Sequence, residues 1–251
     1  DDFTSGIVFC AMKFRAKRLA EQLNRSGHNA VAIQGNMTQG QRDKAMGGFR
    51  KGRYDVLVAT DDERILKAVE TAGYRALMTS PDHLSGTDRV AEAAGQSDAE
   101  IIVNIQGDEP MMDPDSVDCA VKALLDDRAL NVSTLGLPIS DPAEIDDPNV
   151  VKVVTDGGGM ALYFSRAAIP YNRAGEKQPP VMKHLGLYVY RRAFLLEYAA
   201  LKPTELEMTE RLEQLRILEH GFGIKVVIAN RDSIGIDTPE DLIKAEALLN
   251  V

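Results

Sequence analysis

Short apolar runs alternate with stretches of helical periodicity through the first half of the chain, and this alternation constrains the fold more than any other feature. Strands separated by helices are typical of βαβ units, whose parallel strands form a sheet covered by helices on both faces. The sequence therefore predicts an α/β fold with a mostly parallel sheet. The expected strands are Ile7–Cys10, Ala30–Ile33, Asp55–Thr60, Ala76–Met78 and Ile101–Ile105, and the expected helices are Lys13–Ser26, Thr38–Arg50, Glu63–Ala72 and Thr87–Ala94.

The pattern changes after Leu130, where apolar runs follow one another with fewer helices between them, which favours an antiparallel or mixed region. Glu205–Glu219 has the strongest amphipathic periodicity there, and Pro239–Leu249 predicts a closing helix with Pro in its first turn. The polar segment Asn172–Pro180 contains Pro and Gly and predicts a long loop. The expected strands in this part are Val132–Leu137, Val150–Thr155, Met160–Phe164 and Leu185–Tyr190.

The chain has 251 residues and a net charge of −9. Because nucleic-acid surfaces present clustered Lys and Arg, this acidic balance argues against such a surface over the whole molecule. Cys10 and Cys119 lie far apart, which indicates reduced thiols rather than a disulfide framework. No apolar run approaches the length of a membrane span and no signal peptide precedes Gly6, so we expect a cytoplasmic protein without a membrane partner.

Seven motifs follow one another from Val56 onward: VLVATDDERI (56–65), MTSPDHLSGTDR (78–89), VNIQGDEP (103–110), ALYFSRAAIP (161–170), KHLGLYVY (183–190), LEQLR (212–216) and GIDTPEDL (235–242). Through them, residues 56–251 resemble 3-deoxy-manno-octulosonate cytidylyltransferase, or CMP-Kdo synthetase. The resemblance implies a three-layer, Rossmann-like nucleotidyltransferase fold with a mostly parallel mixed sheet. It also implies transfer of CMP from CTP to the acidic sugar Kdo, a precursor of lipopolysaccharide, by a homodimer.

The first 60 residues carry different motifs: GIVFCAMKFRAKRLAEQLNRSG (6–27), VAIQGNMTQGQRDKAMGGFRKG (31–52) and DVLVATD (55–61). They resemble the second RecA-like domain of DEAD-box RNA helicases, which implies an N-terminal βαβαβ segment of RecA-like origin. The two resemblances overlap at VLVATD. The sequence therefore predicts a chimera of residues 1–60 and residues 56–251, joined at a shared strand, with the first part integrated in the sheet of the second.

Two aspartates are candidate ligands for Mg²⁺. Asp108 follows the strand Ile101–Ile105, and Asp237 precedes the helix Pro239–Leu249. Magnesium keeps several waters and needs few carboxylates, and open α/β sheets bind ligands beyond the carboxyl ends of their strands. By resemblance, both aspartates bind the metal and act in catalysis. The alternative is that Asp108 caps a turn and Asp237 caps the helix.

A second group of residues is expected to contact CTP. By resemblance, Gln106 contacts the cytidine nucleotide. Ser85, Gly86 and Thr87 follow a strand and open a helix whose first backbone N–H groups can bind an oxygen-rich ligand. The resemblance places this segment beside the nucleotide base. Ser85 or Thr87 can at the same time be a plain N-cap, and Arg89 can be an ordinary surface residue.

An acidic sugar requires cationic and hydrogen-bonding partners. By resemblance, the Kdo-binding residues are Arg166, His184, Tyr188, Glu213 and Gln214. Arg166 is the candidate partner of the carboxylate, and Glu213 and Gln214 are candidates for the sugar hydroxyls. The alternatives are a purely structural role for His184 and a solvated helix position for Glu213.

The family's first strand leads into a loop of the form A-R-x-x-S-x-R-x-P-G-K, which binds the triphosphate of CTP. This chain has AMKFRAKRLAEQL (11–23) in that place, without Pro or Gly. Its Lys13, Arg15, Lys17 and Arg18 are scattered around a predicted helix. We therefore expect a nucleotidyltransferase with a missing CTP loop and weak or absent catalysis.

Two other functions remain open. One is a non-catalytic engineered fold chimera, and the other is a weak RNA-binding module through residues 1–55. In the second case Gln34–Arg42 contacts the RNA backbone, whereas the alternative for this segment is a structural turn and helix cap. Because the chain has no G-x-x-x-x-G-K-[ST] loop, ATP-driven unwinding is not expected.

Overall fold

The computed structural model describes residues 6–9, 56–71, 76–83, 85–106, 109, 112–173, 175, 180–233 and 235. Its strands are β1 Gly6–Phe9, β2 Val56–Thr60, β3 Ala76–Met78, β4 Ile101–Ile105, β5 Val132–Pro138, β6 Lys152–Thr155, β7 Ala161–Ser165, β8 Met182–Arg191 and β9 Lys225–Ile228. Its helices are α3 Glu63–Thr71, α4 Gly86–Gly95, α5 Pro114–Asp126, α6 Ala143–Asp146, α7 Arg192–Tyr198, α8 Glu205–Glu210 and α9 Gln214–Glu219.

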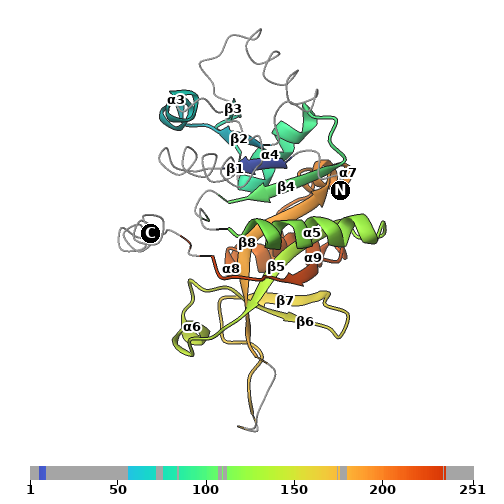
Figure 1. Ribbon diagram of the computed structural model, residues 1–251. Helices are drawn as coiled ribbons and strands as arrows, with labels where there is room; N and C mark the ends of the chain where they lie inside the picture. The colour runs from blue at the N-terminus through green and yellow to red at the C-terminus, as the bar shows by residue number, and fades with distance from the viewer. Residues whose placement is uncertain are drawn as a thin grey trace.

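The described strands form a three-stranded parallel sheet and a six-stranded sheet in which parallel and antiparallel pairs are mixed, as expected. Strands β1, β2 and β3 form a parallel set in the order β1-β2-β3, and β1 lies beside β4 (Figure 1). Strand β4 pairs antiparallel with β8, β8 pairs antiparallel with β5, and β5 pairs parallel with β9. Strands β6 and β7 form an antiparallel pair that joins the sheet through β8. The sequence predicted the change of pattern after Leu130, but β4, which was expected among the parallel strands, already pairs antiparallel with β8. The other antiparallel pairs join strands that lie after Leu130.

Strand β8 occupies the centre of this arrangement because its ten residues pair with three different strands. Residues 187–191 pair with β4, residues 182–190 pair with β5, and residues 182 and 183 pair with β6. Gly136 on β5 permits the close approach of these strands, since a Cβ there would lie 2.6 Å from Cε of Met182 and 2.8 Å from Cγ1 of Val226.

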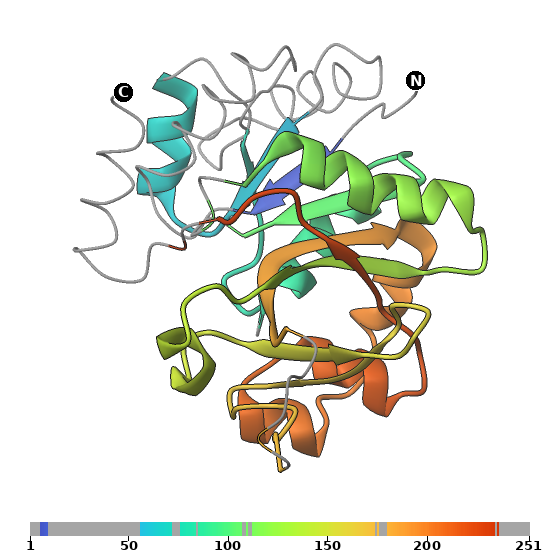
Figure 2. The same cartoon turned by 60° about the horizontal axis from the view of Figure 1, so that its bottom comes forward.

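Helices cover the sheet in layers, and Figure 2 shows α5 lying across the strands. Helix α5 packs on β5, β8 and β9, whereas α4 packs on β1, β2 and β4 and contacts α7. Neighbouring residues of β5 show the two faces: Ser133 donates a hydrogen bond to the Ala120 carbonyl of α5, and Thr134 contacts His184 instead. Alternation of this kind follows from the two-residue period of a strand.

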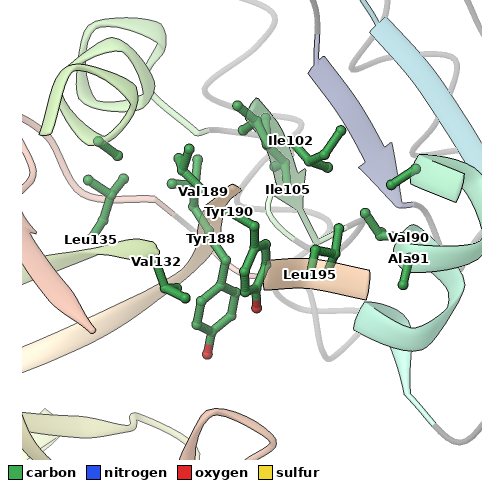
Figure 3. Close-up of a cluster of buried hydrophobic side chains, with 14 of the residues drawn as sticks. Val90, Ala91, Ile102, Ile105, Val132, Leu135, Tyr188, Val189, Tyr190 and Leu195 are labelled. Carbon is green, nitrogen blue, oxygen red and sulfur yellow. The ribbon is translucent and has the colours of Figure 1, made fainter. Parts of the chain in front are cut away.

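The hydrophobic core lies between these layers (Figure 3). On β8, Val189 points away from Tyr188 and Tyr190, so that each face of the strand contributes to a different layer. Val90 of α4 and Leu195 of α7 are fully buried on the tyrosine side. Removal of this apolar surface from water is the main favourable contribution to folding.

Most expected elements of the described region are confirmed within one to three residues, and three helices and one strand were missed. Helix α5 was missed although Asp113 and Pro114 mark its start: the Asp113 carboxylate accepts a hydrogen bond of 3.0 Å from the Ser116 N–H, and Pro114 occupies the first turn. The other missed elements are α6, α7 and β9.

The expectation of one long helix over Glu205–Glu219 is wrong. The chain forms two short helices, α8 and α9, because Arg211 adopts the left-handed conformation with φ of 56°. The amphipathic pattern was misleading because Leu206 and Met208 of α8 are exposed and do not belong to the core. A capping box at Thr204 starts α8 independently of any longer helix.

Several expected elements lie outside the described residues: Lys13–Ser26, Ala30–Ile33, Thr38–Arg50 and Pro239–Leu249. Only part of Asn172–Pro180 is described, and that part contains neither helix nor strand. Among the helices that are described, none is long and apolar enough to cross a membrane.

Arg89 joins α4 to the carboxyl ends of two parallel strands, and it is 5% exposed rather than a surface residue. Its Nη1 donates hydrogen bonds to Oγ1 of Thr79 at 2.6 Å and to the carbonyl of Ser80 at 3.0 Å. Its Nη2 donates to the carboxylate of Asp61 at 2.7 Å. The guanidinium therefore satisfies acceptors at the ends of β2 and β3 together.

We predict that Arg89→Met lowers the free energy of unfolding by about 3 kcal/mol, since it leaves buried acceptors without a donor. The side chain of Asp61 is 38% exposed, so Asp61→Asn should cost less than about 1 kcal/mol. Urea denaturation of both variants measures the difference. Equal losses of unfolding free energy in the two variants would show that the ion pair with Asp61, and not the buried hydrogen bonds of Arg89, stabilises the fold.

Candidate active site

The N-terminus of α4 is the segment expected to lie beside the nucleotide. Ser85 is its N-cap, with an extended backbone, and its hydroxyl accepts a hydrogen bond of 3.2 Å from the Asp88 N–H. The plain capping role is therefore real for Ser85. Gly86 and Thr87 occupy the first turn, where backbone N–H groups lack an intrahelical acceptor and favour an anionic ligand.

Thr87 connects this helix end to the segment that carries the sugar candidates. It is fully buried, and its hydroxyl donates a hydrogen bond of 2.7 Å to Oε1 of Glu213. The two residues are 126 positions apart in sequence. The structure thus brings a nucleotide candidate and a sugar candidate into direct contact.

Glu213 is not a solvated helix residue. Its Oε2 is buried and has no hydrogen-bond partner among the described residues. Burial raises the pKa of this carboxyl above its usual 4.5, while the nearby hydroxyls of Thr87 and Ser85 oppose the shift. The backbone carbonyl of Glu213 accepts a hydrogen bond of 2.9 Å from Oη of Tyr198. A buried carboxylate oxygen without a donor is an incomplete polar site that a hydroxyl-bearing ligand would complete.

Aromatic rings form a continuous row from β8 toward this carboxylate. The ring centroids of His184 and Tyr188 are 5.2 Å apart, those of Tyr188 and Tyr190 are 5.8 Å apart, and those of Tyr190 and Tyr198 are 6.3 Å apart. Tyr188 and Tyr190 lie side by side on the same face of the strand (Figure 3). Burial raises the pKa of each of these tyrosines, so their hydroxyls stay protonated and can donate hydrogen bonds.

His184 lies at the start of this row and is half-buried. Its Nε2 is 2.8 Å from Oγ1 of Thr134, and Phe164 contacts its ring edge-on with centroids 5.3 Å apart. Burial lowers the pKa of His184 to about 3, so the ring is neutral at neutral pH. The side chain therefore has a fixed position and carries no charge.

Arg166 follows β7 and is held by backbone carbonyls. Its Nε donates to the Glu210 carbonyl at 2.8 Å, Nη1 to the Pro148 carbonyl at 2.9 Å and Nη2 to the Arg211 carbonyl at 3.5 Å. A guanidinium has five N–H donors. One N–H on each of Nη1 and Nη2 therefore remains for another partner. Arg166 holds the turn that leads to Glu213, and no contact with His184 or Tyr188 is present among the described residues.

Two residues of the QGDEP motif are described, Gln106 and Glu109, and both contact β8. The N–H of Gln106 donates to the Gly186 carbonyl at 3.2 Å, and the Gly186 N–H donates to Oε1 of Glu109 at 3.3 Å. The other carboxylate oxygen of Glu109 accepts a hydrogen bond from the hydroxyl of Ser233. The motif is thereby connected to the segment that leads into GIDTPEDL.

The two candidate metal ligands, Asp108 and Asp237, lie outside the described residues. Described residues near each aspartate in the sequence are in contact, since the Ser233 hydroxyl donates a hydrogen bond to the carboxylate of Glu109. Gln214 is described, is 4% exposed and begins α9 directly after Glu213. The groups brought together are thus Ser85, Gly86 and Thr87 with Glu213, and His184 with Tyr188.

Sequence reasoning missed Arg216, although it ends the LEQLR motif. It is 3% exposed, pairs with Glu207 at 2.5 Å and with Asp88 at 3.7 Å, and lies over the ring of Tyr198 at 5.0 Å from the centroid. It therefore joins α9 to α4, α7 and α8. A cation at a buried face of an amphipathic pattern was the signal that could have identified it.

Comparison with known proteins defines the class. Residues 47–228 match the family model described as cytidylyltransferase, and residues 2–62 match the model described as helicase conserved C-terminal domain. The fold and the matched model make the chain a nucleotidyltransferase of the cytidylyltransferase type.

Within that class, the chain belongs to the 3-deoxy-manno-octulosonate cytidylyltransferase family. It is 48% identical over 240 residues to the 3-deoxy-manno-octulosonate cytidylyltransferase of Solibacter usitatus, covering 96% of this chain and 90% of the relative. It is 52% identical over 200 residues to that of Geotalea daltonii, covering 76% and 79%. The structure of a CMP:2-keto-3-deoxy-manno-octonic acid synthetase complexed with CTP matches with a TM-score of 0.79 and 34% identity, over 98% of each chain.

We predict that Glu213→Gln raises the melting temperature at pH 7 by about 2–4 °C, the change expected for about 1 kcal/mol in a chain of this length. Because the folded state raises the pKa of Glu213, it holds this proton more tightly than the unfolded chain does. Proton binding to Glu213 therefore adds to the free energy of unfolding below pH 4.5, and this contribution is lost as the pH rises through the higher folded pKa. The difference in melting temperature between Glu213→Gln and the unaltered chain should therefore vanish near pH 4, as measured by scanning calorimetry.

Glu219→Gln is the matched control. The pKa of Glu219 is lowered, chiefly by a hydrogen bond from Thr204, so its replacement should not raise the melting temperature at pH 7. A lower melting temperature for Glu213→Gln at pH 7 would contradict the prediction.

Proposed function

We propose that this chain binds CTP and Kdo and transfers CMP from CTP to Kdo, at a rate lowered by the replacement of its triphosphate loop. The observation that carries the proposal is the hydrogen bond of 2.7 Å between Thr87 and Glu213. It joins the helix end expected to contact the nucleotide to the segment expected to contact the sugar. Membership of the cytidylyltransferase family supports the same reaction.

Kdo recognition follows from the polar groups of the site. Arg166 binds the sugar carboxylate through the two N–H groups that are not hydrogen-bonded to backbone carbonyls. A guanidinium forms charge-assisted hydrogen bonds with carboxylates. The sugar hydroxyls form hydrogen bonds with Glu213, Gln214, His184 and Tyr188. Glu213 supports this assignment through its buried Oε2, which has no donor among the residues that the structure describes.

CTP recognition is assigned to the helix end and to the QGDEP motif. Ser85, Gly86 and Thr87 present the first-turn N–H groups of the ten-residue helix α4 to the nucleotide, and Gln106 contacts it from the end of β4. The peptide of Gln106 is held by Gly186, which supports a fixed orientation for its side chain.

Asp108 and Asp237 are proposed to hold Mg²⁺, which neutralises phosphate charge when bound. Two carboxylates suit this cation, since it keeps several waters. The contact between Glu109 and Ser233 supports the proposal, because it brings together the two segments from which these aspartates come.

In the reaction, a Kdo hydroxyl oxygen attacks the α-phosphorus of CTP and forms a new P–O bond, while its proton passes to solvent. The bond between the α-phosphorus and the oxygen that bridges to the β-phosphorus breaks, and pyrophosphate leaves with that oxygen. Such a step depends on positioning and on stabilisation of negative charge. The residues around Glu213 supply positioning for the acceptor sugar. Residues 11–23 lack the Pro and Gly of the family's triphosphate loop, so charge stabilisation on the leaving group is weakened.

The N-terminal part, residues 1–60, is proposed to be a helicase-like segment integrated into the sheet of the cytidylyltransferase part, residues 56–251. The two family matches overlap over residues 47–62, which include β2. Within residues 2–62, β1 pairs with β2 and lies beside β4, which supports integration over a separate lobe.

We predict that Arg166→Gln weakens Kdo binding roughly 10- to 100-fold, since it removes a charge-assisted hydrogen bond worth about 1.5–3 kcal/mol. Arg64→Gln is the matched control, because the Arg64 side chain is 75% exposed and its described partner is Asp62, directly before α3. Titration calorimetry with Kdo measures both affinities, and thermal unfolding checks that Arg166→Gln keeps the fold. Equal affinities of Arg166→Gln and the unaltered chain would exclude the carboxylate role.

The activity of the unaltered chain tests the proposal as a whole. With CTP, Kdo and Mg²⁺, CMP-Kdo should form more slowly than with a relative that has the A-R-x-x-S-x-R-x-P-G-K loop. Formation at the relative's rate would contradict the loss of triphosphate binding. Absence of Kdo binding would contradict the sugar site, and salt-sensitive binding of RNA in its place would favour the RNA-binding alternative.

A further inference from the structure

Thr134 on β5 makes two hydrogen bonds with a single hydroxyl. Its Oγ1 is 2.6 Å from the carbonyl oxygen of Leu187 and 2.8 Å from Nε2 of His184. Thr134 is fully buried, and the register between β5 and β8 shifts immediately after it. At this irregularity, both the Leu187 carbonyl and the His184 ring lie within reach of one side chain.

The direction of these two hydrogen bonds follows from proton counting. A threonine hydroxyl has one proton to donate and two lone pairs that accept. The carbonyl of Leu187 can only accept, so the Thr134 proton is used there. His184 must therefore donate from Nε2 to Oγ1 of Thr134. In a neutral imidazole, a proton on Nε2 leaves Nδ1 as an acceptor.

Three observations keep His184 in this state. Burial lowers its pKa to about 3, so the doubly protonated ring is absent at neutral pH. Phe164 contacts the ring edge-on and Tyr188 packs against it at a tilt of 43°, which restricts rotation. Among the described residues, none donates a hydrogen bond to Nδ1, so no group of the described chain uses this lone pair.

We propose that Thr134 is a positioning residue that holds His184 as the Nε2–H tautomer, so that Nδ1 accepts a hydrogen bond from a hydroxyl of the acceptor sugar. This inference rests on the proposed function for the identity of the ligand. It specifies which partner His184 recognises: a neutral acceptor attracts a hydroxyl proton and repels a carboxylate. The sugar's carboxylate is then directed to another residue, which agrees with the cationic Arg166.

The tautomer is measurable without substrate. We predict that two-bond 1H–15N correlation spectra of the unaltered chain show His184 protonated on Nε2 alone. The chain has four histidines, and His184→Phe identifies the His184 signals by their disappearance. Thr134→Val, which keeps the shape and removes the hydroxyl, should give a mixture of tautomers, whereas Thr134→Ser should keep the Nε2–H form. Protonation on Nδ1 in the unaltered chain, or an unchanged tautomer in Thr134→Val, would overturn the inference.

Kdo affinity tests the ligand half of the inference. Thr134→Val should weaken Kdo binding about 5- to 10-fold, the loss expected for a mixed population of acceptor and donor rings and one hydrogen bond. Thr134→Ser should keep the Kdo affinity of the unaltered chain, and the CTP affinity should be the same in both variants. Retained affinity with Ser distinguishes positioning of the ring from general damage, since Ser retains the hydroxyl but not the methyl group. Equal Kdo affinity in Thr134→Val and the unaltered chain would overturn the role of Nδ1.

The two readouts separate this inference from the proposed function. If the unaltered chain does not bind Kdo but Thr134→Val still mixes the tautomers, the proposed function fails while the positioning of His184 by Thr134 holds. If Kdo binds but the tautomer is the same in every variant, the proposed function stands and the positioning role fails.

Discussion

The structure depends on one strand that forms backbone hydrogen bonds with three neighbouring strands. Strand β8 pairs with β4, β5 and β6, so its backbone hydrogen bonds fix the relative position of the parallel strands and the antiparallel region. The same strand carries His184, Gly186 and Tyr188. Because the side chains of a strand alternate between its faces, fixing the register of β8 also fixes which of these residues face the candidate site. Gly186 adds a further requirement, since a Cβ there would lie 3.2 Å from Cγ of Glu109.

Around this strand, the candidate site is built from buried charge that the helices hold in place. Arg216 compensates Glu207 and Asp88 in the interior and stacks on Tyr198, whose hydroxyl in turn holds the backbone of Glu213. Breaking a buried ion pair leaves an uncompensated charge, which is why such a network gives α4 and α9 one defined arrangement. Glu213 differs from Glu207 because the hydroxyl of Thr87 is its partner and, within the part of the chain that the structure describes, it forms no ion pair. Glu213 thus keeps a buried carboxylate oxygen without a donor where the segment expected to contact the nucleotide meets the one expected to contact the sugar.

The sequence was sufficient for the class of fold and for most strands, because apolar runs of a strand's length are a local property. It was insufficient where long-range contacts decide. The break at Arg211 could not be seen, since the periodicity of α8 comes from Leu206 and Met208, which are exposed. The burial of Arg89 was missed because its acceptors lie on two other elements. The resemblance selected Glu213, His184 and Tyr188, but their hydrogen-bond partners Thr87 and Thr134 are distant in sequence, and only the fold shows that they meet.

The position of β1 has a consequence for how such proteins diversify. Its four residues, GIVF, lie within the range that matches the helicase model, yet the strand pairs with β2 and lies beside β4. A strand of a parallel sheet is paired through peptide groups, which are the same in every sequence, so such a position requires little more than a short apolar run. The position of β1 can therefore be filled by a segment that matches the helicase model while β4, β5 and β8 keep their pairing.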